Sequence, residues 1–212
     1  MSVFFQIGTN NGNDLFKKLV IQHKPDIVIL VEPNGDLINQ IKENYKNIKG
    51  VFIFNNAVYY NSNETVELYI PSKNGILGNI ADNGIRYHDV HFSLLPMNDW
   101  GKKEDMVKIS AKTITFDDIC KIHNITLIDY LQIDTEGFDS EIIKMIDFSK
   151  YTINKIRFEK WNFKPECFTD HTKIANELGS NGLDLVINKL KGMYTLTDIN
   201  DSDGYDIIAT LN

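Results

Sequence analysis

Acidic side chains and a glycine-rich turn follow the first two apolar runs of the chain. The turn Gly8-Thr9-Asn10-Asn11-Gly12 follows residues 3–7, and Glu32 follows residues 27–31. Glycines allow the backbone to approach a ligand closely before it enters a helix. A carboxylate at the end of a second strand can accept hydrogen bonds from both hydroxyls of a ribose. We therefore predict that Glu32 binds a ribose, with a solvated acid before Pro33 as the alternative.

Three further acids stand at later strand ends. Asp134 and Glu136 follow residues 127–133, and Glu159 follows residues 153–158. Clustered carboxylates raise one another's pKa, which makes a better general base near neutral pH. They could instead hold a divalent cation. The alternatives are acids that favour the start of a helix and, for Glu159, a salt bridge to a lysine.

The elements that must position these residues alternate between strands and helices. Hydrophobic periodicity predicts strands at 3–7, 27–31, 51–54, 64–70, 107–114, 127–133, 153–158, 183–190 and 205–211. It predicts helices at 13–23, 37–45, 116–123 with Thr115 as N-cap, around 142–146 and at 174–178. This alternation is typical of an α/β fold with a parallel sheet, helices on both faces and an antiparallel edge formed by the last two strands. Ligands of such sheets bind at the carboxyl ends of the strands.

One segment departs from this regular order. Residues 71–106 contain several Pro and Gly residues and little periodicity. Long irregular segments within compact domains are often functional loops, so we expect this one to be a lid that selects the acceptor. There is no internal repeat or linker, and residues 1–212 are expected to form a single domain.

Composition restricts the partners. The net charge is −7 and arginine occurs only at Arg86 and Arg157, whereas nucleic-acid binding requires a basic face. Two cysteines without a CxxC pair argue against a disulfide framework or a structural zinc site. No signal peptide or membrane span is evident, so we expect a cytoplasmic protein that binds a small-molecule or glycan acceptor and no membrane. A homodimer is compatible with the sequence.

The glycine turn and Glu32 suit two kinds of cofactor, a nicotinamide dinucleotide and S-adenosylmethionine. The chain is short for a dehydrogenase, and its turn lacks the third glycine that supports a pyrophosphate. Both points favour S-adenosylmethionine, which carries no phosphate. An NAD(P)-dependent reductase and a non-catalytic binding module remain as alternatives.

Six segments, in order along residues 3–160, together resemble the FkbM-type methyltransferases. They are Phe5-Gln6-Ile7-Gly8-Thr9-Asn10-Asn11-Gly12, Val31-Glu32-Pro33-Asn34, Asn56-Ala57-Val58, Thr113-Ile114-Thr115-Phe116-Asp117-Asp118-Ile119, Leu131-Gln132-Ile133-Asp134-Thr135-Glu136-Gly137-Phe138-Asp139 and Ile156-Arg157-Phe158-Glu159. The resemblance implies a Rossmann-like class I methyltransferase sheet with seven mostly parallel strands and an antiparallel edge strand. It also implies methyl transfer from S-adenosylmethionine to a hydroxyl, often on a sugar or a polyketide.

The resemblance also assigns roles to residues. The residues expected to bind the cofactor are Gly8, Thr9, Asn10, Gly12, Glu32, Pro33, Asn56, Ala57 and Asp134. The residues expected to face the methyl group and the acceptor are Asp134, Glu136 and Glu159.

Two positions depart from the family pattern. Gln6 stands where the family usually has Asp, and Gln132 stands where it usually has Lys. Gln6 removes a carboxylate near the sulfonium, and Gln132 changes the charge balance near Asp134. Both departures give weight to the non-catalytic alternative.

Overall fold

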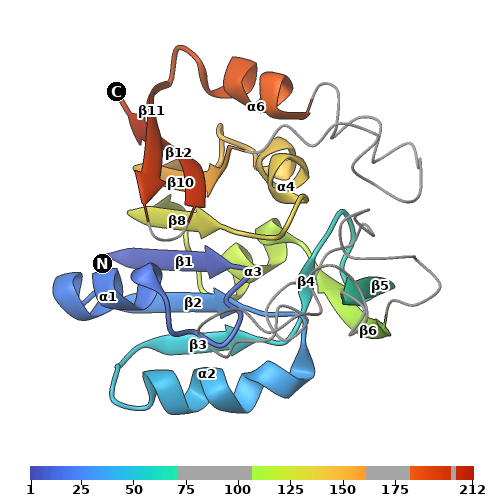
Figure 1. The fold of residues 1–212 in the computed structure, drawn as a ribbon. Coiled ribbons are helices and arrows are strands. Elements are labelled where there is room, and N and C mark those ends of the chain that lie inside the picture. Colours follow the sequence, from blue (N-terminus) through green and yellow to red (C-terminus); the bar gives the residue numbers. More distant parts are fainter. Residues whose placement is uncertain (71–106, 161–181, 202–203) are drawn as a thin grey trace.

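The computed structural model describes residues 1–70, 107–160, 182–201 and 204–212 (Figure 1). The segment 71–106, expected to be a lid, lies outside the described residues, as does the helix expected at 174–178. In the described part of the chain no helix is long and apolar enough to cross a membrane.

A seven-stranded sheet forms the centre of the fold. Its strand order is β11-β12-β10-β8-β1-β2-β3. The bounds are β1 Val3–Ile7, β2 Ile27–Val31, β3 Val51–Phe54, β8 Tyr130–Ile133, β10 Lys155–Glu159, β11 Tyr194–Asp201 and β12 Gly204–Leu211. All neighbours pair in parallel except β12, which runs antiparallel to both β10 and β11. The expected class I methyltransferase sheet with an antiparallel edge is therefore confirmed.

Helices cover both faces of this sheet, because the central strands are apolar on both sides. Every residue of β1 is buried. On one face, Phe4 and its neighbours pack against α1 (Leu15–His23) and α2 (Ile38–Tyr45), which follows a short 3₁₀ turn η1 (Gly35–Leu37). On the other face, Phe5 and Ile7 pack with residues of α3 (Phe116–Ile122), α4 (Asp139–Met145) and α6 (Leu183–Leu190).

The remaining strands form two small sheets. The first has the order β4-β6-β5, with bounds β4 Ala57–Val58, β5 Thr65–Ile70 and β6 Val107–Ile114. The second pairs β7 (Leu127–Ile128) with β9 (Thr152–Ile153). The strand predicted at 127–133 is thus two strands that part at Asp129, whose carboxylate accepts a hydrogen bond of 2.8 Å from the Val3 amide.

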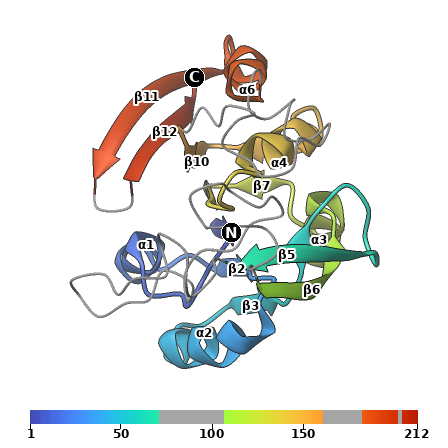
Figure 2. The ribbon, with the colours of Figure 1, turned by 45° about the vertical axis from the view of Figure 1, so that its right-hand side comes forward.

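The prediction of a strand at residues 183–190 is wrong. This segment is the helix α6, and its buried residues Leu183, Val186 and Leu190 are spaced as on one helical face. The strand that pairs with β12 is instead β11, in register over its whole length. The hairpin of β11 and β12 lies beside α6 (Figure 2).

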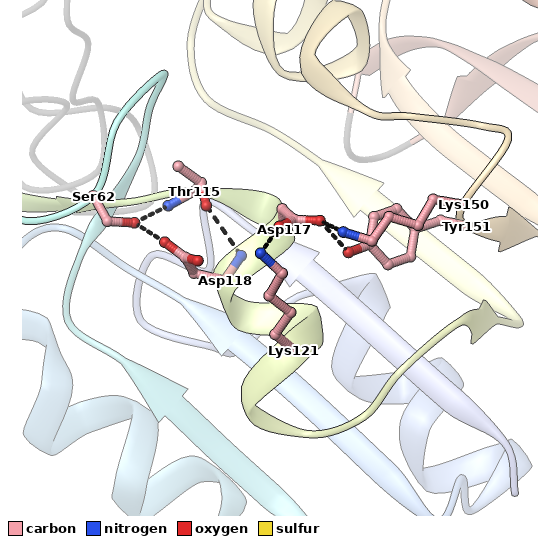
Figure 3. Close-up of polar contacts among 7 residues, drawn as sticks. All are labelled: Ser62, Thr115, Asp117, Asp118, Lys121, Lys150 and Tyr151. Atoms are coloured by element: carbon pink, nitrogen blue, oxygen red, sulfur yellow. Dashed lines mark hydrogen bonds and ion pairs between the residues drawn. The ribbon is translucent and has the colours of Figure 1, made fainter.

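The acids of the Thr115–Asp118 segment anchor the start of α3 (Figure 3). Thr115 is the N-cap, as predicted, and its hydroxyl accepts from the Asp118 amide at 3.0 Å. Asp117 forms ion pairs with Lys121 and Lys150 and accepts from the hydroxyl of Tyr151, and these contacts hold its pKa well below the usual range. The hydroxyl of Ser62 donates to Asp118. This family-like motif therefore stabilises the fold, and none of its residues lines the cleft described below.

Candidate functional site

An open cleft lies where β1, β2 and β8 end, beside β4 and α4. Of the residues predicted to bind a cofactor, those that line it are Gly8, Asn10, Glu32, Pro33, Asn56, Ala57 and Asp134. Glu136 also lines the cleft, whereas Thr9, Gly12 and Glu159 do not. Most of the candidates predicted from the sequence thus lie in one place, as expected of residues at the carboxyl ends of parallel strands.

The glycine turn holds the end of β1 between its two neighbours. The amides of Gly8 and Thr9 donate to the carbonyl of Val31 at 3.0 and 3.1 Å, and the Asp134 amide donates to the carbonyl of Ile7 at 2.9 Å. Gly8 has φ +83°, and a Cβ there would lie 1.7 Å from the carbonyl oxygen of Asp134. Only glycine fits this position, because the chain segments touch backbone to backbone.

Thr9 and Gly12 shape the turn rather than line the cleft. Thr9 is buried, and its hydroxyl donates to the carbonyl of Val31 at 3.3 Å. Gly12 donates to the carbonyl of Thr9 at 2.9 Å and packs against the ring of Tyr45. The turn leads to Asp14, the N-cap of α1.

Glu32 is a buried carboxylate with two backbone donors. Its Oε2 accepts from the Asn10 amide at 2.7 Å, and its Oε1 accepts from the Asn34 amide at 2.8 Å. Burial raises the pKa of Glu32 to about 7, while these two hydrogen bonds oppose the increase. Each carboxylate oxygen has two acceptor positions. Each therefore keeps capacity for one further donor, which suits the paired hydroxyls of a ribose.

The opposite wall of the cleft is apolar. It contains Ala57 and Val58 of β4, Leu68 of β5, and Phe138 and Ile142 around the start of α4. The combination of a few polar groups with an apolar wall is the usual make-up of a small-molecule site.

Carboxylates gather at the ends of β8 and β10. Asp134 is exposed to the cleft, yet protein atoms surround it on its other sides. Partial desolvation, then repulsion from Glu136 and Asp139, raises its pKa. Burial and repulsion from Asp139 raise the pKa of Glu159 to about 10. The predicted acids are therefore close enough to interact, although Glu159 does not line the cleft.

Comparison with protein families identifies the chain. The model of the methyltransferase FkbM domain matches residues 6–185. The chain belongs to the FkbM methyltransferase family. None of the curated proteins matches the sequence. The segments that resembled this family thus identified it correctly.

Several solved methyltransferase structures are similar to the FkbM domain. The O-methyltransferase from Bacillus cereus, in complex with SAH, has 11% identity and a TM-score of 0.49, covering 99% of this chain and 74% of its own. The human methyltransferase 10 domain containing protein has 10% identity and a TM-score of 0.48, covering 100% and 72%. A SAM-dependent methyltransferase from Aquifex aeolicus has 11% identity and a TM-score of 0.42, covering 100% and 82%. These scores are too low to support a conclusion about function.

Sequence reasoning missed the role of Asp139. This buried residue opens α4, and its Oδ1 accepts from the amide of Thr135 at 2.8 Å and from the Thr135 hydroxyl. Its Oδ2 accepts from the amide of Glu159 at 3.1 Å. One carboxylate therefore connects the acid-bearing ends of β8 and β10. The only sequence signal was an acid in the first turn of a helix, which is common in helices of any role because the helix dipole favours it.

The two departures from the family pattern are neighbours in space. Gln6 of β1 and Gln132 of β8 are in register on adjacent strands. Gln6 donates from Nε2 to Asp14 at 2.5 Å. The Oε1 atoms of both glutamines are buried and accept no hydrogen bond from the residues that the structure describes.

A metal ligand set was the other chemistry considered for the acids. Within the described ranges, no group of three or more His, Cys, Asp or Glu side chains has a geometry that could hold a metal ion.

Proposed function

We propose that this FkbM domain transfers a methyl group from S-adenosylmethionine to a hydroxyl of a sugar or a similar small molecule. The observation that carries the proposal is the shared cleft. Glu32, with acceptor capacity to spare on both oxygens, lines the same cleft as the carboxylate of Asp134.

The residues of the cleft fit the cofactor. S-adenosylmethionine supplies a methyl group on a sulfonium, which is already an activated leaving group. Glu32 would accept from both ribose hydroxyls, and the wall of Ala57, Leu68 and Phe138 would cover the adenine ring. Gly8 and Asn10 bring the turn close to the remainder of the cofactor. Because methyl transfer requires mainly alignment of the partners, such positioning supplies much of the catalysis.

Asp134 is the general base in this proposal, with Glu136 as the second candidate. A sugar hydroxyl is a poor nucleophile, and a positioned base accelerates its reaction by about 10²–10⁴-fold. The raised pKa of Asp134 makes its ionised form a stronger proton acceptor than an ordinary aspartate. The hydroxyl proton moves to this carboxylate as the acceptor oxygen takes the methyl group.

The family match favours methyl transfer over the reductase. The common small reductases use a Tyr-x-x-x-Lys pair, and the chain contains this spacing at Tyr45/Lys49, Tyr69/Lys73 and Tyr151/Lys155. None of these three tyrosines lines the cleft. Tyr45 is the buried last residue of α2, and Tyr151 donates to Asp117 on the structural motif.

Calorimetric titration with S-adenosylhomocysteine tests the proposal, with NADH as the competing ligand. We expect S-adenosylhomocysteine to bind with micromolar affinity. Its binding to Glu32→Gln should be at least tenfold weaker, because this substitution removes the charge and keeps the shape of the side chain. Glu43→Gln is the matched control, because Glu43 is exposed on α2 and pairs only with Lys46 among described residues. Binding of NADH alone, or no binding of either ligand, would refute the proposal and favour the reductase or the binding module.

A further inference from the structure

Two rows of polar side chains cross the central strands on one face of the sheet. The first row consists of Gln6 on β1, Gln132 on β8 and Arg157 on β10, which are in register. The second row consists of Asp134 and Glu159, at the ends of β8 and β10. Alternate residues of a strand share a face, so Asp134 and Glu159 follow Gln132 and Arg157 on that same face. On this face Gln6 and Gln132 lie between the carboxylates at the strand ends and the apolar cluster that contains Phe4 and Tyr130.

Three buried oxygen atoms in these rows lack a donor. They are Oε1 of Gln6, Oε1 of Gln132 and Oε2 of Glu159, and none accepts a hydrogen bond from a described residue. Gln6 is 0% and Gln132 is 3% exposed. A buried acceptor without a donor destabilises the fold. Such atoms point to a bound group that supplies N–H or O–H donors.

Carboxyl groups gather around these atoms. Burial raises the pKa of Glu159 most, and repulsion from Asp139, Glu136, Asp134 and Asp206 raises it further. The nearby Arg157 forms an ion pair with Asp206, Nε to Oδ2 at 2.5 Å. An occupant of this site is therefore favoured if it carries positive charge as well as donors.

A protonated amine meets both requirements. It has three N–H donors and a positive charge, whereas a neutral hydroxyl has one donor and no charge. A metal ion is a poorer fit, since the described residues provide no metal-binding group. We propose that the acceptor is an amino sugar or a similar amino-polyol, whose ammonium group binds at Glu159 and Gln132 while a neighbouring hydroxyl faces Asp134. This inference rests on the proposed function and specifies its substrate class.

Matched sugars test the inference. Glucosamine, glucose and N-acetylglucosamine would be titrated by ligand-observed NMR into the protein, with and without saturating S-adenosylhomocysteine. We expect glucosamine to bind at least about tenfold more tightly than glucose. N-acetylglucosamine should bind like glucose, because acetylation removes the charge. Raising the salt to about 0.5 M should reduce the preference, since salt screens charges that solvent can reach.

Two variants test which residues produce the preference for glucosamine over glucose. Glu159→Gln removes the carboxyl group that a bound ammonium would ionise, with little change in shape, and should abolish the preference for glucosamine. Gln132→Met leaves the net charge unchanged and should weaken glucosamine binding by removing one acceptor. Asp198→Asn is the control, because Asp198 is 69% exposed on β11 and pairs with Lys160. Circular dichroism and thermal melting of each variant establish that it is folded.

The outcomes separate this inference from the proposed function. Equal affinity for the three sugars, or no binding of glucosamine, overturns the inference. Glucosamine binding that saturating S-adenosylhomocysteine displaces also overturns it, because the acids would then belong to the cofactor's own site. If S-adenosylhomocysteine fails to bind while the preference for glucosamine persists, the proposed function fails and the amine site stands.

Discussion

The chain contains two acidic segments of similar appearance, residues 115–119 and residues 134–139, and their surroundings differ. Asp117 of the first segment is bound by Lys121 and Lys150, which keep its pKa low. Desolvation and then repulsion from the neighbouring carboxylates raise the pKa of Asp134 in the second. Segment 115–119 anchors a helix, whereas segment 134–139 borders the cleft.

The contrast shows how an acidic motif can be assigned. In both segments acids precede or open a helix, where negative charge is favourable in any protein. Cations and hydroxyl donors satisfy the first segment, which thus needs no ligand. Asp134 of the second segment has further acids as its electrostatic neighbours, and that arrangement is typical of functional sites.

The largest expected effect is that of Gly8→Ala, which would disturb the segment 134–139 at the cleft and leave the segment 115–119 unchanged. The new Cβ would overlap the carbonyl of Asp134 at 1.7 Å, so we expect a loss of about 3–5 kcal/mol in unfolding free energy. Gly192→Ala is the control, because Gly192 also has positive φ, +88°, and nothing lies within 4 Å of its Cβ position. The Gly192→Ala variant should lose only about 1–2 kcal/mol of unfolding free energy. Equal losses in urea denaturation would show that the close approach does not matter.

The pH dependence of stability should reveal the burial of Glu32. Its pKa is about 7 in the folded protein against an ordinary 4.5, so the folded state binds the proton more tightly. Stability should therefore fall as the pH rises from 4.5 to 7, by an amount on the order of 3 kcal/mol. Denaturation of Glu32→Gln across this window should show a fall smaller by that amount, because the raised pKa values of Glu159 and Asp134 still lower stability as the pH rises. An equal fall in the variant and the unchanged protein would contradict the burial of an ionisable Glu32.

Asp134→Asn should raise stability, although it removes the proposed base. The folded-state pKa of Asp134 is raised, so its ionised form opposes folding at pH 8. Solvent in the cleft moderates the repulsion, and we expect Tm to rise by about 2–4 °C. The gain should shrink as the pH is lowered toward 4, where both states are protonated. A lower Tm at pH 8 would mean that this carboxylate has an unrecognised stabilising partner.

Asp117→Asn should have the smallest effect, with the opposite sign. The pKa of Asp117 is lowered in the folded protein, so its charge supports the fold above the ordinary pKa of 3.8 and loses that role as the pH falls. Its ion pairs are largely exposed, and such pairs contribute little. We expect Tm at pH 8 to fall by about 1–3 °C, and high salt should remove most of the difference. A rise in Tm would contradict the assignment of this motif to stability.

Strand ends were the most predictable part of the molecule. Residues 3–7 and 27–31 are apolar throughout and are bounded by a glycine turn and by Glu32-Pro33, so both strands and the place of Glu32 followed from the sequence. Residues 183–190 were mistaken for a strand because Val186 and Ile187 are β-branched. The helical spacing of Leu183, Val186 and Leu190 was the better signal.

The sequence could not supply the contacts between distant segments. The bonds from Asp139 to Thr135 and Glu159 exist only because β8 and β10 are neighbours. The same pairing of strands explains why Gln6 and Gln132, separate departures in the sequence, are one feature of the structure. Lys121 is four residues after Asp117 on one helix, so the sequence indicates that pair, whereas the pairing of Asp117 with the distant Lys150 follows only from the fold.

The most direct test of the contrast is a carboxyl ¹³C NMR titration that follows Asp117, Asp134 and Glu159 in one sample. Single Asn or Gln variants of the three residues would assign the signals. We expect Glu159 to titrate near pH 10 and Asp134 well above its ordinary range, while Asp117 stays ionised below pH 3.8. Titration of all three between about pH 3.5 and 4.5, as in model peptides, would contradict the contrast between the two segments.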